Sequence, residues 1–396
     1  MLKLTTNIKT DFGRELLQAS FVSKFIGSKE ASLAIADLDS LMAPGGGLFA
    51  SAGSNYRGMI FGRDSLEVAD DLLATKPELA LNVIDLLAFY QGSSEDNNKK
   101  SGVQAGKIMH QHGQLEYRDL RVSKDTANLI KKLSELWGGN DEGFTNYDSL
   151  DSTPLFIRLI SRYGLKYGPE FLNKEVAHKS GKIYARRYYL DESLKWLIKH
   201  LFLSSIGFLE FRKEHKDSII IQNWRDSGSS LVHLDGRQAN INEYIAPLEV
   251  QGYAYDALVM SARLFEKYQL ASDVEVHRLR TVANTLRENL FSSFWMEEKQ
   301  SFAMALDRDE NHNPRLIKTP SSSQGALLDS RLFSDLDDEL RYKYVGGIVK
   351  AVYNSNFITD VGIRCRSKDY AYLTGFADYH GSWAVWAKES YDFAKG

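Results

Sequence analysis

One segment, Gln222–Ser227, places a tryptophan, an arginine and an aspartate together between an apolar stretch and a glycine- and serine-rich turn. The indole of Trp224 suits the face of a sugar ring, and a carboxyl beside an aromatic wall is partly desolvated. Desolvation raises the pKa of a carboxyl, so Asp226 could keep its proton for acid catalysis. Arg225 must then point away, because a facing guanidinium would lower that pKa. Turn formation is the alternative role of Asp226.

A second cluster lies near the C-terminal end and combines aromatic side chains, a histidine and two carboxylates. Its members are Asp378, Tyr379, His380, Trp383, Trp386 and Glu389. Such a cluster could bind a sugar and supply a second catalytic carboxylate. Alternatively, Trp383 and Trp386 are three residues apart and could form the core-facing stripe of one helix.

Four further clusters carry polar side chains that could bind hydroxyl groups. Their candidate residues are Arg63, Asp64, Lys107, His110, Asp151 and Glu249. An arginine beside an aspartate offers several donors and two acceptors to neighbouring sugar hydroxyls. The alternatives are structural, since Asp64 and Asp151 could each cap a helix and Glu249 could face a helix dipole.

Helical periodicity dominates the remainder of the chain. Ser272 and Glu275 form a capping-box pattern, and Asp191 is placed to cap another helix. Further helices are expected near residues 29–42, 64–74, 77–91, 125–137, 152–164, 248–268, 333–350 and 383–394. Strand patterns are few and short, near residues 1–9, 218–223 and 301–306. The pattern predicts an all-α chain of helical hairpins arranged in a ring, with minor short strands.

We find no linker that divides residues 1–396, so a single domain is expected. In a ring of hairpins, the loops at one end converge on a pocket, and catalytic groups come from distant loops. The polar and aromatic clusters described above would then meet at that end.

Composition excludes several classes of protein. With 49 basic and 52 acidic residues, the net charge of −3 gives no electrostatic reason to expect a nucleic-acid partner. No apolar run reaches the roughly 18 residues of a spanning helix, and no secretory signal is evident, so no membrane partner is expected. Cys365 is the only cysteine, which rules out an internal disulfide and multi-cysteine zinc. A reducing, cytoplasmic location fits.

Taken in order, the six clusters resemble glycogen-debranching enzymes of the amylo-α-1,6-glucosidase type. The family patterns are F-G-R-D, G-K-I-x-H, D-x-T-P-L-F, Q-x-W-K-D-S, E-V-Q-G-Y and Y-H-N-G-S-V-W-P-H-D. They are matched by Phe61–Asp64, Gly106–His110, Asp151–Phe156, Gln222–Ser227, Glu249–Tyr253 and Tyr379–Glu389. The family belongs to the glucoamylase-like group, so the resemblance implies an (α/α)6 barrel of six helical hairpins.

The resemblance also implies individual roles. Arg63 and Asp64 would hold glucose hydroxyls, and Asp226 would be the general acid. The last motif departs from the family pattern, because two residues are added before Trp386 and Glu389 stands near the expected aspartate. The chain stops soon after Glu389, and we therefore expect a shortened final helix.

These observations favour an inverting glycosidase that acts on α-glucosidic bonds of glycogen-like or malto- and isomalto-type glucans. Asp226 would protonate the leaving oxygen, and Glu389, or less favourably Asp378, would activate water from roughly 6.5–9.5 Å away. This chemistry requires no metal and no organic cofactor. The alternatives are a glycosidase for another short α-linked oligosaccharide or glycoside, and a non-catalytic carbohydrate-binding relative.

Overall fold

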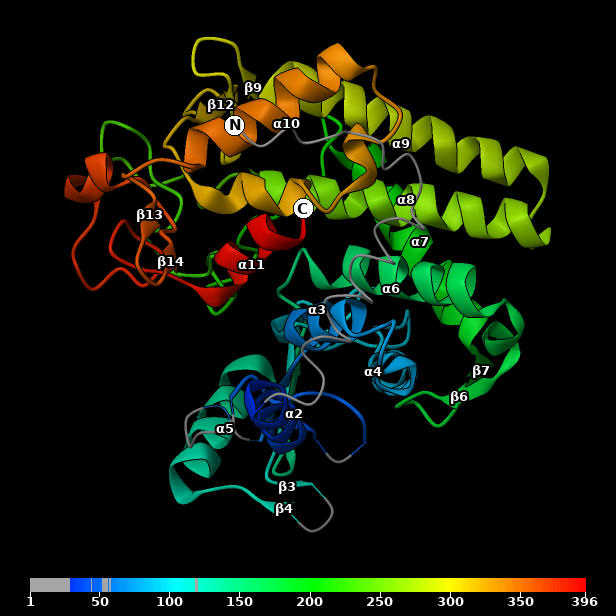
Figure 1. Cartoon of the computed structure of the whole chain (residues 1–396). Coiled ribbons are helices and arrows are strands. Elements are labelled where there is room, and N and C mark those ends of the chain that lie inside the picture. Colours follow the sequence, from blue (N-terminus) through cyan, green and yellow to red (C-terminus); the bar gives the residue numbers. More distant parts are fainter. Residues whose placement is uncertain (1–28, 44, 52–55, 57, 118–119) are drawn as a thin grey trace.

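The computed structural model describes residues 29–396 except 44, 52–55, 57 and 118–119 (Figure 1). The strand predicted near residues 1–9 lies outside this part. Within it the chain is mainly helical, as predicted. The α-helices are α2 (Lys29–Leu41), α3 (Gly62–Asp71), α4 (Pro77–Phe89), α5 (Lys124–Trp137), α6 (Ser152–Tyr167), α7 (Arg186–Leu203), α8 (Leu248–Tyr268), α9 (Asp273–Phe294), α10 (Asp338–Val352) and α11 (Ala387–Lys395).

Two local signals explain helix ends that the sequence predicted well. Ser272 accepts a hydrogen bond from the backbone of Glu275, whose side chain accepts one in return, and this capping box begins α9. Pro77 occupies the first turn of α4, where the missing N–H has no cost.

An inner ring of helices organises the molecule. Helix α6 packs between α3 and α8, and α8 in turn packs against the 3-10 helix η3 (Ser322–Leu327), which contacts α11. Outer helices cover this ring: α4 lies against α3 and α6, α7 against α6, α9 against α8, and α10 against η3. The helices α3, α6, α8 and α11 are therefore neighbours whose first turns can share one site.

Ion pairs close the ring between its last and first helices. Lys388 of α11 lies 3.1 Å from Glu67 of α3, and Lys395 lies 3.1 Å from Asp71. Lys388 also pairs with Asp392 one turn later on its own helix, at 2.9 Å. Charged contacts thus hold the helix that carries Glu389 against the helix that carries Arg63.

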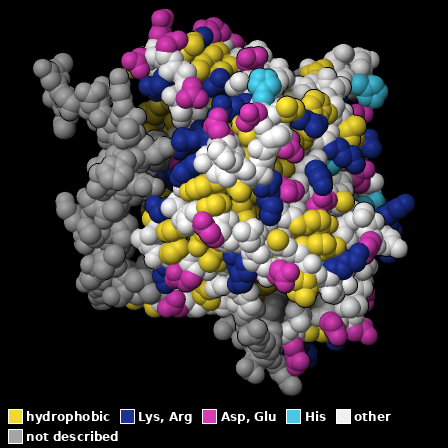
Figure 2. All heavy atoms as spheres, turned by 90° about the vertical axis from the view of Figure 1, so that its right-hand side faces the viewer, with side chains coloured by type: hydrophobic (Ala, Val, Ile, Leu, Met, Phe, Trp, Pro, Cys, Tyr) yellow, Lys and Arg dark blue, Asp and Glu magenta, His cyan; other side chains and the backbone are white. Residues whose placement is uncertain are grey.

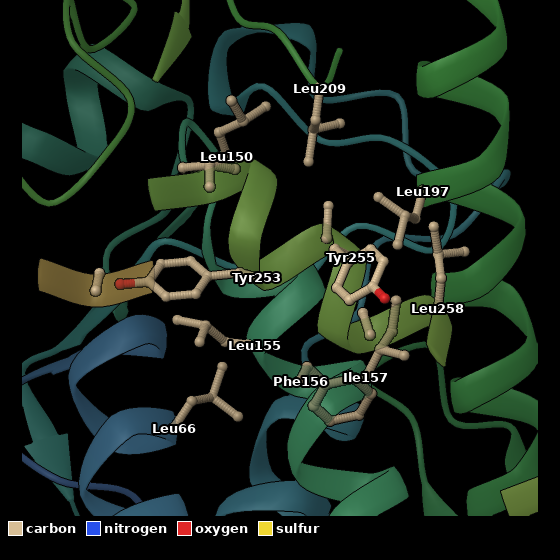
Figure 3. Close-up of a cluster of buried hydrophobic side chains, with 14 of the residues drawn as sticks. Leu66, Leu150, Leu155, Phe156, Ile157, Leu197, Leu209, Tyr253, Tyr255 and Leu258 are labelled. Atoms are coloured by element: carbon tan, nitrogen blue, oxygen red, sulfur yellow. The ribbon is translucent and has the colours of Figure 1, made fainter. Parts of the chain in front are cut away.

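One large apolar core fills the space between the inner and outer helices. Leu66 of α3, Leu155 and Phe156 of α6, and Tyr253 and Leu258 of α8 converge in it (Figure 3). A smaller core, built on Met59, Ile130, Trp137 and Phe144, lies between α5 and a short sheet. Burial of these apolar surfaces positions the helices whose first turns carry the polar residues.

Short antiparallel sheets connect the helices. Two of these sheets have three strands. The first consists of β1 (Met59–Phe61), β2 (Gln111–Gln114) and β5 (Gly143–Asn146), and in its register Ile60 lies opposite His112 and His112 lies opposite Thr145. The second consists of β8 (Ala246–Pro247), β11 (Ala305–Arg308) and β12 (Pro314–Ile317). Two-stranded pairs are β3 (Glu116–Tyr117) with β4 (Leu120–Arg121), β6 (Glu175–Ala177) with β7 (Ile183–Ala185), β9 (Trp295–Met296) with β10 (Ser301–Phe302), and β13 (Ile358–Thr359) with β14 (Gly362–Ile363).

Three local predictions were wrong. The segment 218–223 is not a strand, because Ile219 N–H donates to the Asp148 carboxylate and Gln222 C=O accepts from Leu150. Asp191 does not cap α7, which begins five residues earlier at Arg186. The helix predicted from residue 383 begins only at Ala387, and Trp383 and Trp386 are both partly exposed, so they form no core-facing stripe.

The surface in Figure 2 shows acidic and basic side chains interspersed with apolar ones. None of the described helices combines the length and the apolar character needed to cross a membrane.

Candidate active site

The first turns of the inner helices gather the predicted sugar-binding residues. Arg63, in the first turn of α3, donates from Nη1 to Asp151 Oδ2 at 3.2 Å and from Nη2 to Asp64 Oδ2 at 3.4 Å. Neither aspartate makes a side-chain cap of its helix. Arg63 and Asp151 are buried, whereas Asp64 is half-buried. The capping alternative is therefore wrong for both, and the three residues form one polar cluster.

Gly62 explains why His110 lies beside this cluster. A Cβ at position 62 would lie 2.3 Å from the carbonyl oxygen of Met109, so only glycine permits this close approach. Gly62 N–H donates to His110 C=O at 2.8 Å, and the His110 ring packs edge-on against Phe61. Burial, with Arg63 and Lys107 nearby, lowers the pKa of His110 to about 3, so its imidazole is neutral.

Asp226 lies at the edge of this region, on the loop that follows Trp224. The Tyr379 hydroxyl donates to Asp226 Oδ1 at 2.8 Å, and the carboxyl side chain is 37% exposed. Burial raises the pKa of Asp226 above its ordinary value, although Tyr379 and Arg63 act in the opposite direction. A raised pKa with access to solvent is the state that a general acid requires.

His380 is neutral and does not compete for the proton of Asp226. Its Nδ1 accepts the backbone N–H of Ser227 at 3.3 Å and lies 4.0 Å from Asp226 Oδ1. Burial and the charge of Arg225 lower the pKa of His380 to about 3. With Nδ1 acting as an acceptor, the ring proton is on Nε2.

Aromatic rings surround the same residues. Trp224 packs edge-on against His380, with centroids 4.9 Å apart, and against Trp386, with centroids 5.5 Å apart. The Trp386 indole N–H donates to the carbonyl oxygen of Tyr379 at 2.6 Å. Trp224, Tyr379, His380 and Trp386 thus form one cluster with Asp226.

Glu389, in the first turn of α11, contacts a positively charged side chain. Arg225 Nη2 donates to Glu389 Oε1 at 2.5 Å, and the Trp224 indole N–H donates to the same oxygen at 3.1 Å. Arg225 and Glu389 are both buried. Arg225 also donates to Ser322 Oγ and to the carbonyl oxygen of Cys365, at 3.0 Å each. Arg225 therefore points away from Asp226 and forms a buried ion pair with Glu389.

Glu249, in the first turn of α8, is a third buried carboxyl beside this ion pair. Asn223 Nδ2 donates to Glu249 Oε1 at 2.5 Å. Burial raises the pKa of Glu249 to about 7, although Arg225 and Asn223 favour its ionised form and Glu389 opposes it. Sequence reasoning missed Asn223, whose position next to Trp224 was the only local signal.

We expect Glu249→Gln to change the pH dependence of stability. The glutamine can still accept the hydrogen bond from Asn223, but it does not titrate. In the wild type the raised pKa favours the folded state below pH 4.5, and this contribution is lost as the pH rises to about 7. The melting temperature of the variant should therefore rise relative to the wild type across this window. A difference in melting temperature between the two proteins that stays constant from pH 4.5 to 7 would contradict the raised pKa of Glu249.

Asp378 serves a structural role. It accepts from Ser227 Oγ at 2.9 Å and from the backbone N–H of His380 at 3.1 Å, and Arg366 Nη2 lies 3.4 Å away. These contacts hold the pKa of Asp378 below its ordinary value despite burial. With its oxygens engaged in this way, Asp378 is less suited than Glu389 to activate water.

Two predicted residues lie apart from the cluster. The ammonium of Lys107 faces the ring of Trp196 on α7, 5.8 Å from its centroid. Trp383 packs against Phe376 and over Arg364 instead of joining Trp224. Lys388, which sequence reasoning missed, lies 5.7 Å from the Trp224 ring centroid and links the site to Glu67.

A cavity of about 600 Å³ lies elsewhere, between the later turns of α3, α6 and α8, and none of the predicted site residues lines it. Ion pairs such as Arg158 with Asp70, at 2.9 Å, occupy its wall. Over the described part of the chain, no group of His, Cys, Asp and Glu side chains is arranged to hold a metal ion.

Comparisons with known proteins identify the architecture. No family model and no curated protein matches the sequence. A sugar epimerase from a ruminal bacterium matches with a TM-score of 0.51 and 11% identity, over 93% of this chain and 81% of that one. A GH63 mannosylglycerate hydrolase from Thermus thermophilus, solved with glucose, matches with a TM-score of 0.54 and 12% identity, over 92% and 85%. Neutral trehalase Nth1 from Saccharomyces cerevisiae matches with a TM-score of 0.41 and 13% identity, over 87% and 62%.

The first two of these likenesses show that the chain has the (α/α)6 glycosidase-like fold, in agreement with the predicted fold class.

Proposed function

We propose that this protein is an inverting α-glucosidase that hydrolyses glucosidic bonds of an α-glucan, in the manner of the debranching enzymes that its motifs resemble. The observation that carries the proposal is the contrast between two carboxyl groups near Trp224. Burial raises the pKa of Asp226, whereas the buried Glu389 carboxyl accepts hydrogen bonds from Arg225 and from the Trp224 indole. Groups in such opposite settings suit an acid and a base.

In the proposed mechanism, the glucose ring at the bond to be cut lies against Trp224 and within reach of Arg63. The Arg63 guanidinium and the carboxylates of Asp64 and Asp151 together supply donors and acceptors to vicinal hydroxyls. His110 and His380 are both neutral and add no charge near the sugar. A neutral polyol is therefore the ligand class that these side chains suit.

Asp226 then donates its proton to the glycosidic oxygen as the bond to the anomeric carbon breaks. Nearby carboxylates stabilise the positive charge that develops on the sugar. A water molecule attacks the anomeric carbon from the face opposite to the leaving oxygen. Glu389 takes a proton from that water. Both described contacts of Glu389 fall on Oε1, so Oε2 is the oxygen assigned to this step.

Two further observations support the substrate class. The solved hydrolase with this fold acts on mannosylglycerate and was crystallised with glucose, so the fold accommodates glucose in a relative. The motifs at Phe61–Asp64 and Gln222–Ser227 fall on the site that the structure assembles. We also propose a cytoplasmic location, which suits a chain with a single, buried cysteine.

The proposal is tested by incubating the protein with α-1,4-, α-1,6- and α-1,1-linked glucosides and with β-linked controls. We expect release of glucose from at least one α-linked series and from no β-linked one. Conversion of a free sugar into an epimer, without hydrolysis of any glucoside, would contradict the proposal and favour the chemistry of the epimerase relative.

A further inference from the structure

A pair of exposed aromatic rings lies on the loop that also carries Tyr379 and His380 of the candidate active site. The rings of Phe376 and Trp383 have centroids 6.1 Å apart and planes inclined by 38°. Phe376 is 82% exposed and Trp383 is 43% exposed. Single exposed apolar side chains are ordinary, but adjacent exposed rings next to a site indicate a binding surface. Neither ring belongs to the cluster around Trp224.

The surrounding contacts hold Trp383 in place although it is exposed. The Arg364 guanidinium lies over its ring, 5.5 Å from the centroid, and Arg364 Nη1 donates to the carbonyl oxygen of Ser382 at 3.1 Å. The Ser382 hydroxyl donates to the carbonyl oxygen of Ser367 at 2.9 Å. A side chain fixed in this way loses little conformational entropy when it binds a ligand.

The loop that carries these rings is continuous with the catalytic cluster. Tyr379, between Phe376 and Trp383 in the chain, donates to Asp226 and accepts from the Trp386 indole. Tyr379 and Trp386 are 50% and 40% exposed, respectively. The loop that contacts the proposed acid therefore carries several exposed rings, and the acid must face the leaving part of the substrate.

We propose that Phe376 and Trp383 form an aromatic platform that binds glucose units of the substrate chain beyond the bond being cut. This inference rests on the proposed function of Asp226. The platform rings offer flat apolar faces, which suit the C–H faces of a neutral sugar. Relative to the debranching-type motif, this chain lacks the asparagine and carries Trp383 and Ala384 as two added residues before Val385 and Trp386, so Trp383 is a feature of this sequence.

The test compares sugar binding by chain length, measured by calorimetry on Asp226→Asn so that no substrate is consumed. Trp383→Ala and Phe376→Ala should each weaken binding of maltoheptaose about tenfold, the effect of losing about 1.4 kcal/mol. Binding of maltose should change less than about twofold, because a ligand this short does not reach the platform. Trp383→Phe retains a ring and should recover most of the affinity. Tyr342→Ala, which removes an 82%-exposed ring on α10, is the matched control.

The platform is contradicted if the alanine variants bind maltoheptaose like the control, if they weaken maltose equally, or if the parent binds no glucan chain. An exposed aromatic pair that instead serves as a protein interface would give the first of these results. Hydrolysis is measured separately on the wild type. Chain binding that depends on Trp383 in a protein without hydrolytic activity would support the platform and contradict the proposed catalysis. Hydrolysis by the wild type, together with chain binding that does not depend on Trp383 or Phe376, would support the proposed catalysis and contradict the platform.

Discussion

Asp226→Asn is expected to lower kcat on natural α-glucans by at least about a hundredfold, the lower contribution of general acid catalysis. The asparagine keeps the size of the side chain and can still accept the hydrogen bond from Tyr379. It has no proton to give to the leaving oxygen. Binding of the sugar should be largely retained, because Arg63, Asp64 and Trp224 are unchanged.

The control for this variant is a substrate whose leaving group needs no proton. With α-glucosyl fluoride the loss should be markedly smaller, since fluoride departs without acid assistance. An unfolded variant would lose both activities alike, so the comparison separates catalysis from folding. If Asp226→Asn hydrolysed natural glucans at the wild-type rate, Asp226 would not be the acid and would only form a turn.

Glu389→Gln is expected to lower kcat by at least about a hundredfold on both kinds of substrate. The amide cannot take a proton from water, and water must be activated whichever group leaves. The expected pattern therefore differs from that of Asp226→Asn, because the fluoride is not spared. Equal sparing of the fluoride in both variants would contradict the assignment of acid and base.

Loss of the ion pair complicates the glutamine variant, because it leaves the buried guanidinium of Arg225 without its anionic partner. Glu389→Asp is the matched variant, since it keeps the charge but withdraws the carboxylate by one methylene. We expect Glu389→Asp to have a higher melting temperature than Glu389→Gln, while its kcat remains low. Full activity in Glu389→Asp would show that the position of this carboxylate is not critical.

Local sequence patterns predicted most helices, because helix periodicity and capping are local. The candidate site residues came from short motifs, and their role in catalysis stays a prediction. The capping box of Ser272 at the start of α9 shows this most clearly. The role of Asp151 could not be decided locally, since an aspartate before a helix is usually a cap. Its partner Arg63 is 88 residues away in the sequence.

Long-range contacts explain why some predictions from the sequence were wrong. Arg186 makes two hydrogen bonds with Asp85 of α4, at 2.6 and 2.7 Å, and so extends α7 upstream of the capping signal at Asp191. The Asp148 carboxylate likewise holds Ile219 in an irregular segment. The pairing of Lys388 with Glu67 joins the last helix of the ring to the first, and nothing local in the sequence predicts it.

The stereochemistry of hydrolysis tests the central claim most directly. An α-glucan that the protein hydrolyses would be followed by proton NMR from the first minutes, before mutarotation mixes the anomers. Direct attack of water activated by Glu389 inverts the anomeric carbon, so we predict that β-glucose appears first. Initial release of α-glucose would require a covalent intermediate or a different pair of residues, and it would contradict the assignment of Asp226 and Glu389 as acid and base.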